Sequence, residues 1–256
     1  FPSQLDARKA VLLTFVAFLF TGFQCAIYGM LTVPIAAHFE LDANRIIFFD
    51  GFGLWGQILA MATGGMLIRK IKGKNTLLVA AVLMIVGSIC SIYSPNVYIY
   101  TAMVFLCNMA VGYVLVSCNY MIMGTVTEEG QSQGKLSFLN LFFSLGFLLS
   151  APIVGAIITH ASWEMVFVVV MVLFILFILF LLSLRVDETL EQGIEEAKST
   201  SEKSFLTPAI LLSAAALFLI VYVEQIMNYF NQPHLHYDLN FDMQTVGFMV
   251  SAYIAA

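Results

Sequence analysis

The 256-residue chain is 61% hydrophobic, only 11% charged, and carries a formal net charge of −5, whereas ordinary globular domains are about 25% charged. These values exclude a soluble protein, and the negative charge argues against a nucleic-acid-binding protein, which needs a basic surface. The four cysteines lie in apolar runs without CxxC or Cys/His spacing, so neither a zinc site nor a disulfide framework is indicated.

Apolar runs long enough to cross a bilayer recur along the whole chain. A bilayer core takes about 20 apolar residues per helix. We therefore predict an all-α, multi-pass membrane protein, and the final run, cut off by the end of the sequence, suggests a fragment of a longer protein. The predicted spans lie at about residues 10–37, 46–68, 76–94, 97–125, 136–159, 163–184 and 206–230, with an eighth starting near 243.

A hydrophilic, acidic segment at residues 186–205 separates the sixth span from the seventh. We expect residues 1–185 to form an N-terminal six-helix bundle. Residues 186–205 would be a cytoplasmic linker, and residues 206–256 would hold the first helices of a second, truncated bundle.

The basic residues predict the orientation in the membrane, because short cytoplasmic loops are enriched in Lys and Arg. Arg45 is the one basic residue of the 11 that falls on the opposite side from the rest. The N-terminus is therefore predicted to be cytoplasmic. Tyrosines flank the outer helix ends, where we expect interfacial aromatic residues: Tyr93, Tyr98, Tyr100 and Tyr237.

The fifth predicted helix contains small residues and a proline, Gly146, Pro152 and Gly155, which let a second helix approach closely. The run Ala151-Pro152-x-x-Gly155 resembles the Gly-Pro-x-x-Gly signature on the fifth helix of the major facilitator superfamily. The run from Trp163 to Phe167 (WEMVF) resembles that superfamily's Trp-Arg-x-x-Phe entry into the sixth helix. Ala151 and Glu164 depart from the usual Gly and Arg.

The loop after the second helix, Gly64 to Lys74, resembles the superfamily's Gly-x-x-x-Asp-Arg-x-Gly-Arg-Lys signature in outline, with the Asp missing and the spacing off by one. A plain positive-inside loop explains the charges equally well. The patterns of the first and fifth helices resemble the TsgA-like and fucose-permease-like branch. The resemblance implies a transporter without a cofactor, coupled to protons, with a central cavity lined by helices 1, 4 and 7.

Three predicted helices carry polar pairs at helical spacing, and polar groups at bilayer depth are costly enough to need a reason. These helices are the three that the resemblance assigns to the cavity. Amides offer paired donors and acceptors, so the lining suits a neutral polyol or sugar, although each residue could equally hydrogen bond neighbouring helices. The candidate substrate-binding residues are Gln24 and Tyr28, Asn108 and Asn119, and Glu224 and Asn228.

Two acids are candidates for proton coupling. Glu224 lies within the seventh helix, where coupling, substrate contact and a structural hydrogen bond remain equal alternatives. Asp50 lies near the outer end of the second helix, and we expect it to reach the interface and stay solvated. Asn140, near the cytoplasmic end of the fifth helix, is a candidate for gating or helix packing. His234 and His236 lack a carboxylate at matching spacing, so no metal site is predicted.

The sequence therefore predicts a monomeric secondary transporter of the bacterial cytoplasmic membrane, with partners limited to the bilayer, a proton and a small, neutral, sugar-like solute. No nucleophile–base arrangement, phosphate loop or haem motif is present, so we do not expect an enzyme. A drug or metabolite exporter of the same fold, and a non-transporting membrane sensor, are the alternatives.

Overall fold

The computed structural model describes residues 4–125, 131–183, 212, 227 and 229–255. The described part is helical and contains no strand. Six of its helices are long and apolar enough to span a membrane. They are α1 (Gln4–His38), α2 (Ala43–Ile71), α3 (Gly73–Ile92), α4 (Val97–Met123), α5 (Gln131–His160) and α6 (Glu164–Ser183). A short π-helical turn, η1 (His234–Asp238), and α9 (Met243–Ala255) follow.

The predicted spans and the observed helices agree in number and order for the first six, and the eighth run begins as α9 at Met243. The predicted linker and nearly all of the seventh span lie outside the described residues. Connections within the bundle are short, and Lys72 alone separates α2 from α3. Its φ of 73° lies in the left-handed region, which ends α2 and reverses the chain direction.

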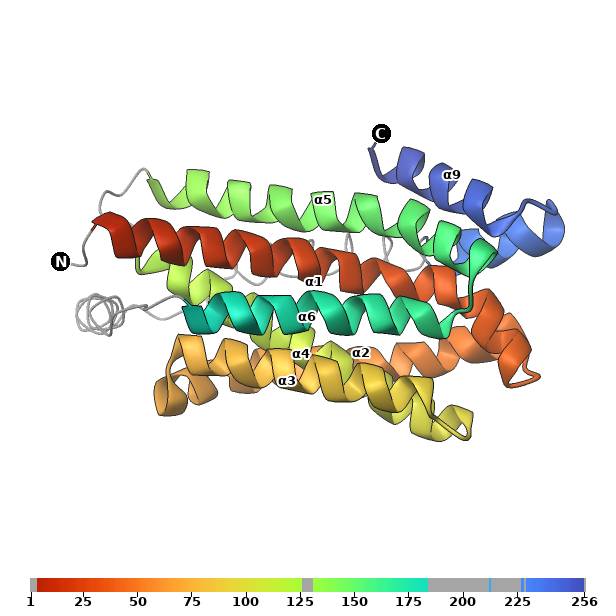
Figure 1. Ribbon diagram of the computed structural model, residues 1–256, viewed down its shortest axis with the longest axis horizontal. Coiled ribbons are helices and arrows are strands. Elements are labelled where there is room, and N and C mark those ends of the chain that lie inside the picture. Colours follow the sequence, from red (N-terminus) through yellow and green to blue (C-terminus); the bar gives the residue numbers. More distant parts are fainter. Residues whose placement is uncertain (1–3, 126–130, 184–211, 213–226, 228, 256) are drawn as a thin grey trace.

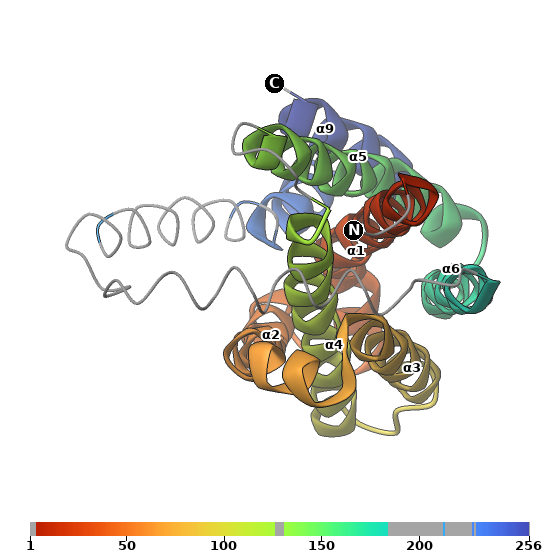
Figure 2. The same ribbon diagram turned by 90° about the vertical axis from the view of Figure 1, so that its left-hand side faces the viewer.

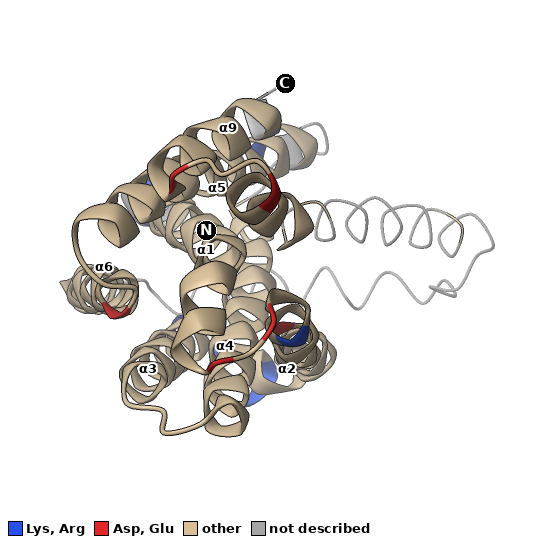
Figure 3. Ribbon diagram, turned by 90° about the vertical axis from the view of Figure 1, so that its right-hand side faces the viewer, with Lys and Arg blue, Asp and Glu red and all other residues tan. Residues whose placement is uncertain are grey.

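The helices run side by side along the long axis of the bundle (Figure 1). One end gathers the N-terminus and the α2–α3 corner, and the other gathers the α1–α2 and α5–α6 corners. We call the second end the outer end, after the predicted orientation; Figure 3 looks onto it and shows acidic residues at the helix corners. Seen end-on, α5 and α9 lie on one side and α2 and α3 on the other, with α1 and α4 between them (Figure 2).

The core lies where α1 and α4 cross the other helices, and its largest buried side chains are apolar or aromatic. Close contacts at glycine hold the bundle together. A Cβ on Gly146 of α5 would overlap the carbonyl oxygen of Leu19 on α1, and a Cβ on Gly247 of α9 would overlap that of Ala151 on α5. Helix α5 continues through Pro152, because its freed backbone groups can be accommodated by neighbouring helices.

Candidate functional site

Gln24 and Tyr28 are fully buried on α1 and touch each other. The Gln24 Nε2 atom donates a hydrogen bond to the Tyr28 hydroxyl at 2.8 Å, as their spacing of four residues allows. The Oε1 atom of Gln24 has no hydrogen-bond partner among the described residues. The amide therefore retains an acceptor inside the bundle, and buried polar groups without partners call for an explanation.

Asp50, on α2, is also fully buried, so the expectation that it reaches the interface and stays solvated is wrong. Both carboxyl oxygens lack a hydrogen-bond partner within the described part of the chain. Three tyrosines of the described chain are buried as well: Tyr28, Tyr100 and Tyr229. Helix α2 packs against α4 and α1, and this packing removes Asp50 from water.

Asn108 lies against Gly53, one helical turn after Asp50, where α2 and α4 cross. A Cβ on Gly53 would lie 3.1 Å from Asn108 Nδ2. That Nδ2 atom donates to the Val104 carbonyl on its own helix at 3.0 Å, and the side chain is only 3% exposed. A residue larger than glycine at position 53 would displace the side chains of Val104 and Asn108.

One buried tyrosine of α4 was misassigned from the sequence. Tyr100 was predicted to be an interfacial aromatic residue, but it is fully buried and its hydroxyl has no partner among the described residues. Its spacing to Val104 and Cys107 places it on the buried face of α4, which is the signal that could have identified it. Tyr93, Tyr98 and Tyr237 are exposed, and their position at the membrane interface stays a prediction.

Asn119 and Asn140 are not part of this buried group. Asn119 lies eleven residues beyond Asn108, about 16 Å along α4, and it is exposed, with Nδ2 donating to the Leu115 carbonyl at 2.8 Å. Asn140 is exposed on α5. Glu224 and Asn228 lie outside the described residues, so their assignment to the site stays a prediction.

The small residues of α5 lie at close helix contacts on two faces. Gly146 packs against Leu19 and Phe23 of α1, and Gly155 packs against Met243 of α9. Pro152 lies beside Gly247 of α9. The role of Gly146, Pro152 and Gly155 in gating stays a prediction.

The histidines near the outer end make pairwise contacts. Contrary to the expectation from the sequence, His234 has a carboxylate at helical spacing, because its Nδ1 atom pairs with Asp238 Oδ2 at 2.6 Å. His236 Nδ1 lies 2.8 Å from the Phe241 carbonyl oxygen. Within the ranges that the structure describes, His, Cys, Asp and Glu form no group of three or more that could hold a metal ion.

The group of polar residues comprising Gln24, Tyr28, Asp50, Tyr100 and Asn108 lies in the outer half of α1, α2 and α4; we call it the outer polar cluster. It offers amide and hydroxyl groups that can donate and accept hydrogen bonds, and one carboxyl that can take up and release a proton. Such a set of side chains can bind a neutral polar molecule. The net charge of the set changes by one when the carboxyl gains or loses a proton. A cofactor site is not suggested by this chemistry.

Comparison with known proteins gives a family and a fold. The chain matches the family model described as Major Facilitator Superfamily over residues 12–256, which places it among membrane transporters rather than enzymes. No curated protein matches the sequence. The TsgA-like branch is not confirmed by these comparisons.

Several solved transporters share the fold. The chain is similar to a D-xylose-proton symporter (17% identity, TM-score 0.69, 96% of this chain and 65% of that one). It is also similar to the xylose transporter XylE from E. coli in an inward-open conformation (16%, 0.73, 96% and 67%). A third is the nucleoside transporter NupG (15%, 0.65, 98% and 62%). The chain thus spans about two thirds of the length of these proteins, and at this identity the likeness shows the fold alone.

Proposed function

Because the chain belongs to the Major Facilitator Superfamily, we propose that it is part of a proton-coupled secondary transporter for a small, neutral, sugar-like solute. It would act in a bacterial cytoplasmic membrane, N-terminus inside, by alternating access between two bundles. The observation that carries the proposal is the carboxyl of Asp50, buried with both oxygens unpartnered among the described residues. Two similar structures are named as a proton symporter for a sugar and a transporter for nucleosides.

Solute binding is assigned to the amides and hydroxyls of the outer polar cluster. Gln24 presents an acceptor without a partner in the described chain, and Tyr28 is held in place by its hydrogen bond to Gln24. Asn108 lies on the facing helix α4 and completes this half of the site. The remaining predicted ligands, Asn119, Glu224 and Asn228, would contribute from the inner half of α4 and from the seventh helix.

Proton coupling is assigned to Asp50. Moving an ionised carboxylate out of water costs several kcal/mol, and a proton on Asp50 removes that cost while helices close over it. The carboxyl would take up a proton when the site opens to the outer side and release it when the site opens to the cytoplasm, so that the proton crosses the membrane with the solute. Solute bound to Gln24 and Asn108 would stabilise the closed, protonated state, so that one proton moves with each solute molecule. Glu224 remains the second candidate from the sequence.

Uptake by reconstituted full-length protein tests the proposal. Liposomes are screened with sugars and nucleosides, with and without an inward proton gradient. Asp50→Asn, which mimics the protonated acid permanently, should lose gradient-driven accumulation by at least tenfold, about 1.4 kcal/mol. It should retain exchange of labelled for unlabelled solute, because exchange does not need the proton to leave.

Matched variants make the test specific. Asp42→Asn removes an exposed carboxyl eight residues away on the same side and should leave accumulation unchanged. Glu224→Gln separates the two candidate acids. Undiminished accumulation in Asp50→Asn would refute the coupling role of that residue. Solute expelled against its gradient would favour the exporter alternative, and the absence of any flux would favour the sensor.

A further inference from the structure

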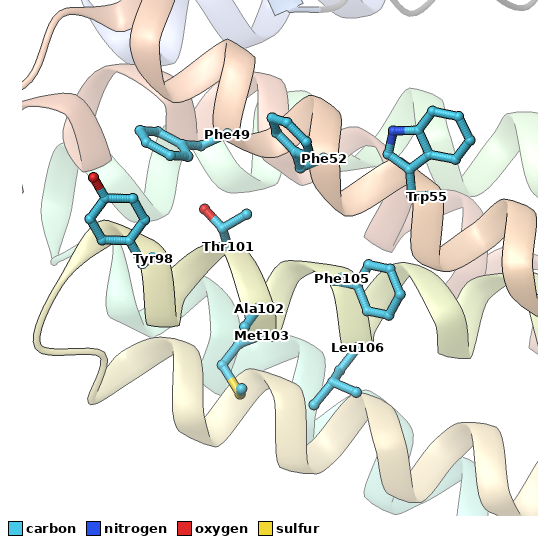
Figure 4. A pocket seen from close by; sticks show the side chains of 9 residues that line it. All are labelled: Phe49, Phe52, Trp55, Tyr98, Thr101, Ala102, Met103, Phe105 and Leu106. Carbon is cyan, nitrogen blue, oxygen red and sulfur yellow. The ribbon is translucent and has the colours of Figure 1, made fainter.

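The exposed side of the α2–α4 pair carries an open apolar groove, and no residue of the outer polar cluster lines it. It has a volume of about 870 Å³, within the range of sites that enclose small ligands. Figure 4 shows Phe49, Phe52 and Trp55 in a row along α2, with residues of α4 facing them. We call it the α2–α4 groove; its α4 lining is Tyr98, Thr101, Ala102, Met103, Phe105 and Leu106.

A second, smaller pocket of about 410 Å³ continues the groove toward the outer end. The two share Phe49 and Tyr98, whose rings meet edge to face at 5.6 Å. Asn44 and Arg45 line the smaller pocket. The apolar groove therefore ends in a polar mouth with a cation, at the level where the predicted orientation puts the lipid headgroups.

Arg45 is available for a ligand. Its side chain is exposed and forms no hydrogen bond or salt bridge with a residue that the structure describes. It is also the one basic residue that the sequence places on the outer side of the membrane. A guanidinium group pairs well with phosphate, because its planar fork can donate two parallel hydrogen bonds.

We propose that the α2–α4 groove binds one anionic phospholipid, with its phosphate on Arg45 and an acyl chain along the groove. The charge at the mouth and the apolar lining behind it match the two ends of such a molecule. Trp55 lies ten residues after Arg45, about 15 Å along the helix, or about half of a 30 Å hydrocarbon core. A chain anchored at Arg45 thus reaches Trp55 near its end.

Trp55 provides the probe for this proposal, because the 256 residues contain only two tryptophans. In the full-length protein, Trp163→Phe and replacement of any other tryptophan leave Trp55 as the sole fluorophore. The protein is placed in two kinds of phosphatidylcholine vesicle. One contains phosphatidylglycerol brominated near the ends of its acyl chains, and the other contains phosphatidylcholine brominated at the same positions. Brominated phosphatidylglycerol should reach half-maximal quenching of Trp55 at a mole fraction about fivefold lower than brominated phosphatidylcholine needs. This is the ratio expected for one basic residue near an anionic lipid.

Three variants decide the outcome without any transport measurement. Arg45→Gln should bring the two quenching curves together, and Ala102→Phe, which fills the groove, should also abolish the preference. Arg69→Gln removes an exposed arginine at the inner end of the same helix and should leave the preference intact. Equal quenching by both lipids in the unsubstituted protein overturns the proposal, as does a preference that persists in Arg45→Gln or Ala102→Phe.

Discussion

The α1–α5 pair and the α2–α4 pair each cross at two glycines that face the backbone of the other helix. In the first pair, Gly22 of α1 meets Phe143, and Gly146 of α5 meets Leu19. The second pair repeats this arrangement with Gly56 of α2 against Phe105 and Gly112 of α4 against Gln57. Exchanging helices 1–3 with helices 4–6 converts one pair into the other, which is the relation expected from internal three-helix repeats.

The two pairs enclose different chemistry. Between α1 and α5, Phe15 and Phe142 stack at 4.8 Å, and Phe18 meets Phe143 at 6.2 Å. Between α2 and α4, Asn108 lies against Gly53, and the buried Asp50 lies one turn before that glycine. The same backbone device thus supports an apolar seam on one side and a polar site on the other, so the packing glycines do not by themselves mark the functional half.

The outward faces of the pairs differ as well. Helix α9 covers α5, where Ser251 Oγ donates to the Leu148 carbonyl at 2.8 Å. The face of α2 carries exposed aromatic side chains, including Trp55 at 59% exposure. One pair is therefore attached to the following segment of protein, while the other presents a surface that suits lipid.

The largest expected effect comes from adding a methyl group at the helix crossings. Gly146→Ala and Gly56→Ala would each place a Cβ on a facing carbonyl oxygen, at a cost of about 1–3 kcal/mol or more. Gly51→Ala and Gly65→Ala meet nothing within 4 Å and should be neutral or slightly stabilising. Thermal unfolding of purified variants measures the difference. If Gly146→Ala lowered the stability and Gly56→Ala did not, the two helix pairs would not share the same glycine packing.

Asn108 and Asn119 distinguish the buried site from the rest of α4. Asn108→Ala should weaken the apparent affinity for the transported solute about tenfold, the effect of losing one hydrogen bond of about 1.4 kcal/mol in a buried site. Asn119→Ala, at an exposed position, should change it less than Asn108→Ala does. Initial uptake rates over a range of solute concentrations give both values. An equal or larger effect of Asn119→Ala would move solute binding toward the inner end of α4.

The apolar seam should affect stability without affecting solute binding. Phe142→Leu removes the stacked partner of Phe15 and should lower the free energy of unfolding by about 0.5–1.5 kcal/mol. Its apparent affinity for solute should match that of the unsubstituted protein. Thermal unfolding and uptake on the same preparation test this. A changed affinity would mean that the seam is coupled to the polar site.

The smallest predicted effect concerns the stability of α9, the helix that packs on α5. Asp242 precedes α9 and accepts hydrogen bonds from the backbone N–H groups of Gln244 and Thr245 at 3.0 Å, and from the Thr245 hydroxyl at 2.6 Å. The Thr245 hydrogen bonds are the largest contribution lowering the pKa of Asp242 below its ordinary value of 3.8. Its stabilising effect is therefore complete above that value and is lost as pH falls through the lowered pKa.

Hydrogen exchange measures this capping effect. Amides in the first turn of α9, corrected for intrinsic rates, should exchange faster in the strongly acidic range than at neutral pH. Asp242→Ala should show the fast exchange at both pH values. An identical acid response in Asp242→Ala would assign the change to another group.

The helices could be predicted from the sequence because span length and apolar content are local properties. The Gln24–Tyr28 contact could be predicted for the same reason, since both residues lie on one helix. The burial of Asp50 could not, because it depends on the packing of α2 against α4, two helices that are far apart in the sequence. The position of Asp50 near the end of a helix suggested that its carboxyl is solvated. Only the tertiary structure shows that the packing of other helices buries it.

The central claim is that Asp50 exchanges a proton with each transport cycle. The direct measurement is the external pH of a lightly buffered suspension of vesicles, without a membrane potential, when transported solute is added. The account predicts alkalinisation with the unsubstituted protein and with Asp42→Asn, and none with Asp50→Asn, although the latter still exchanges labelled solute. Alkalinisation of normal size with Asp50→Asn would contradict it.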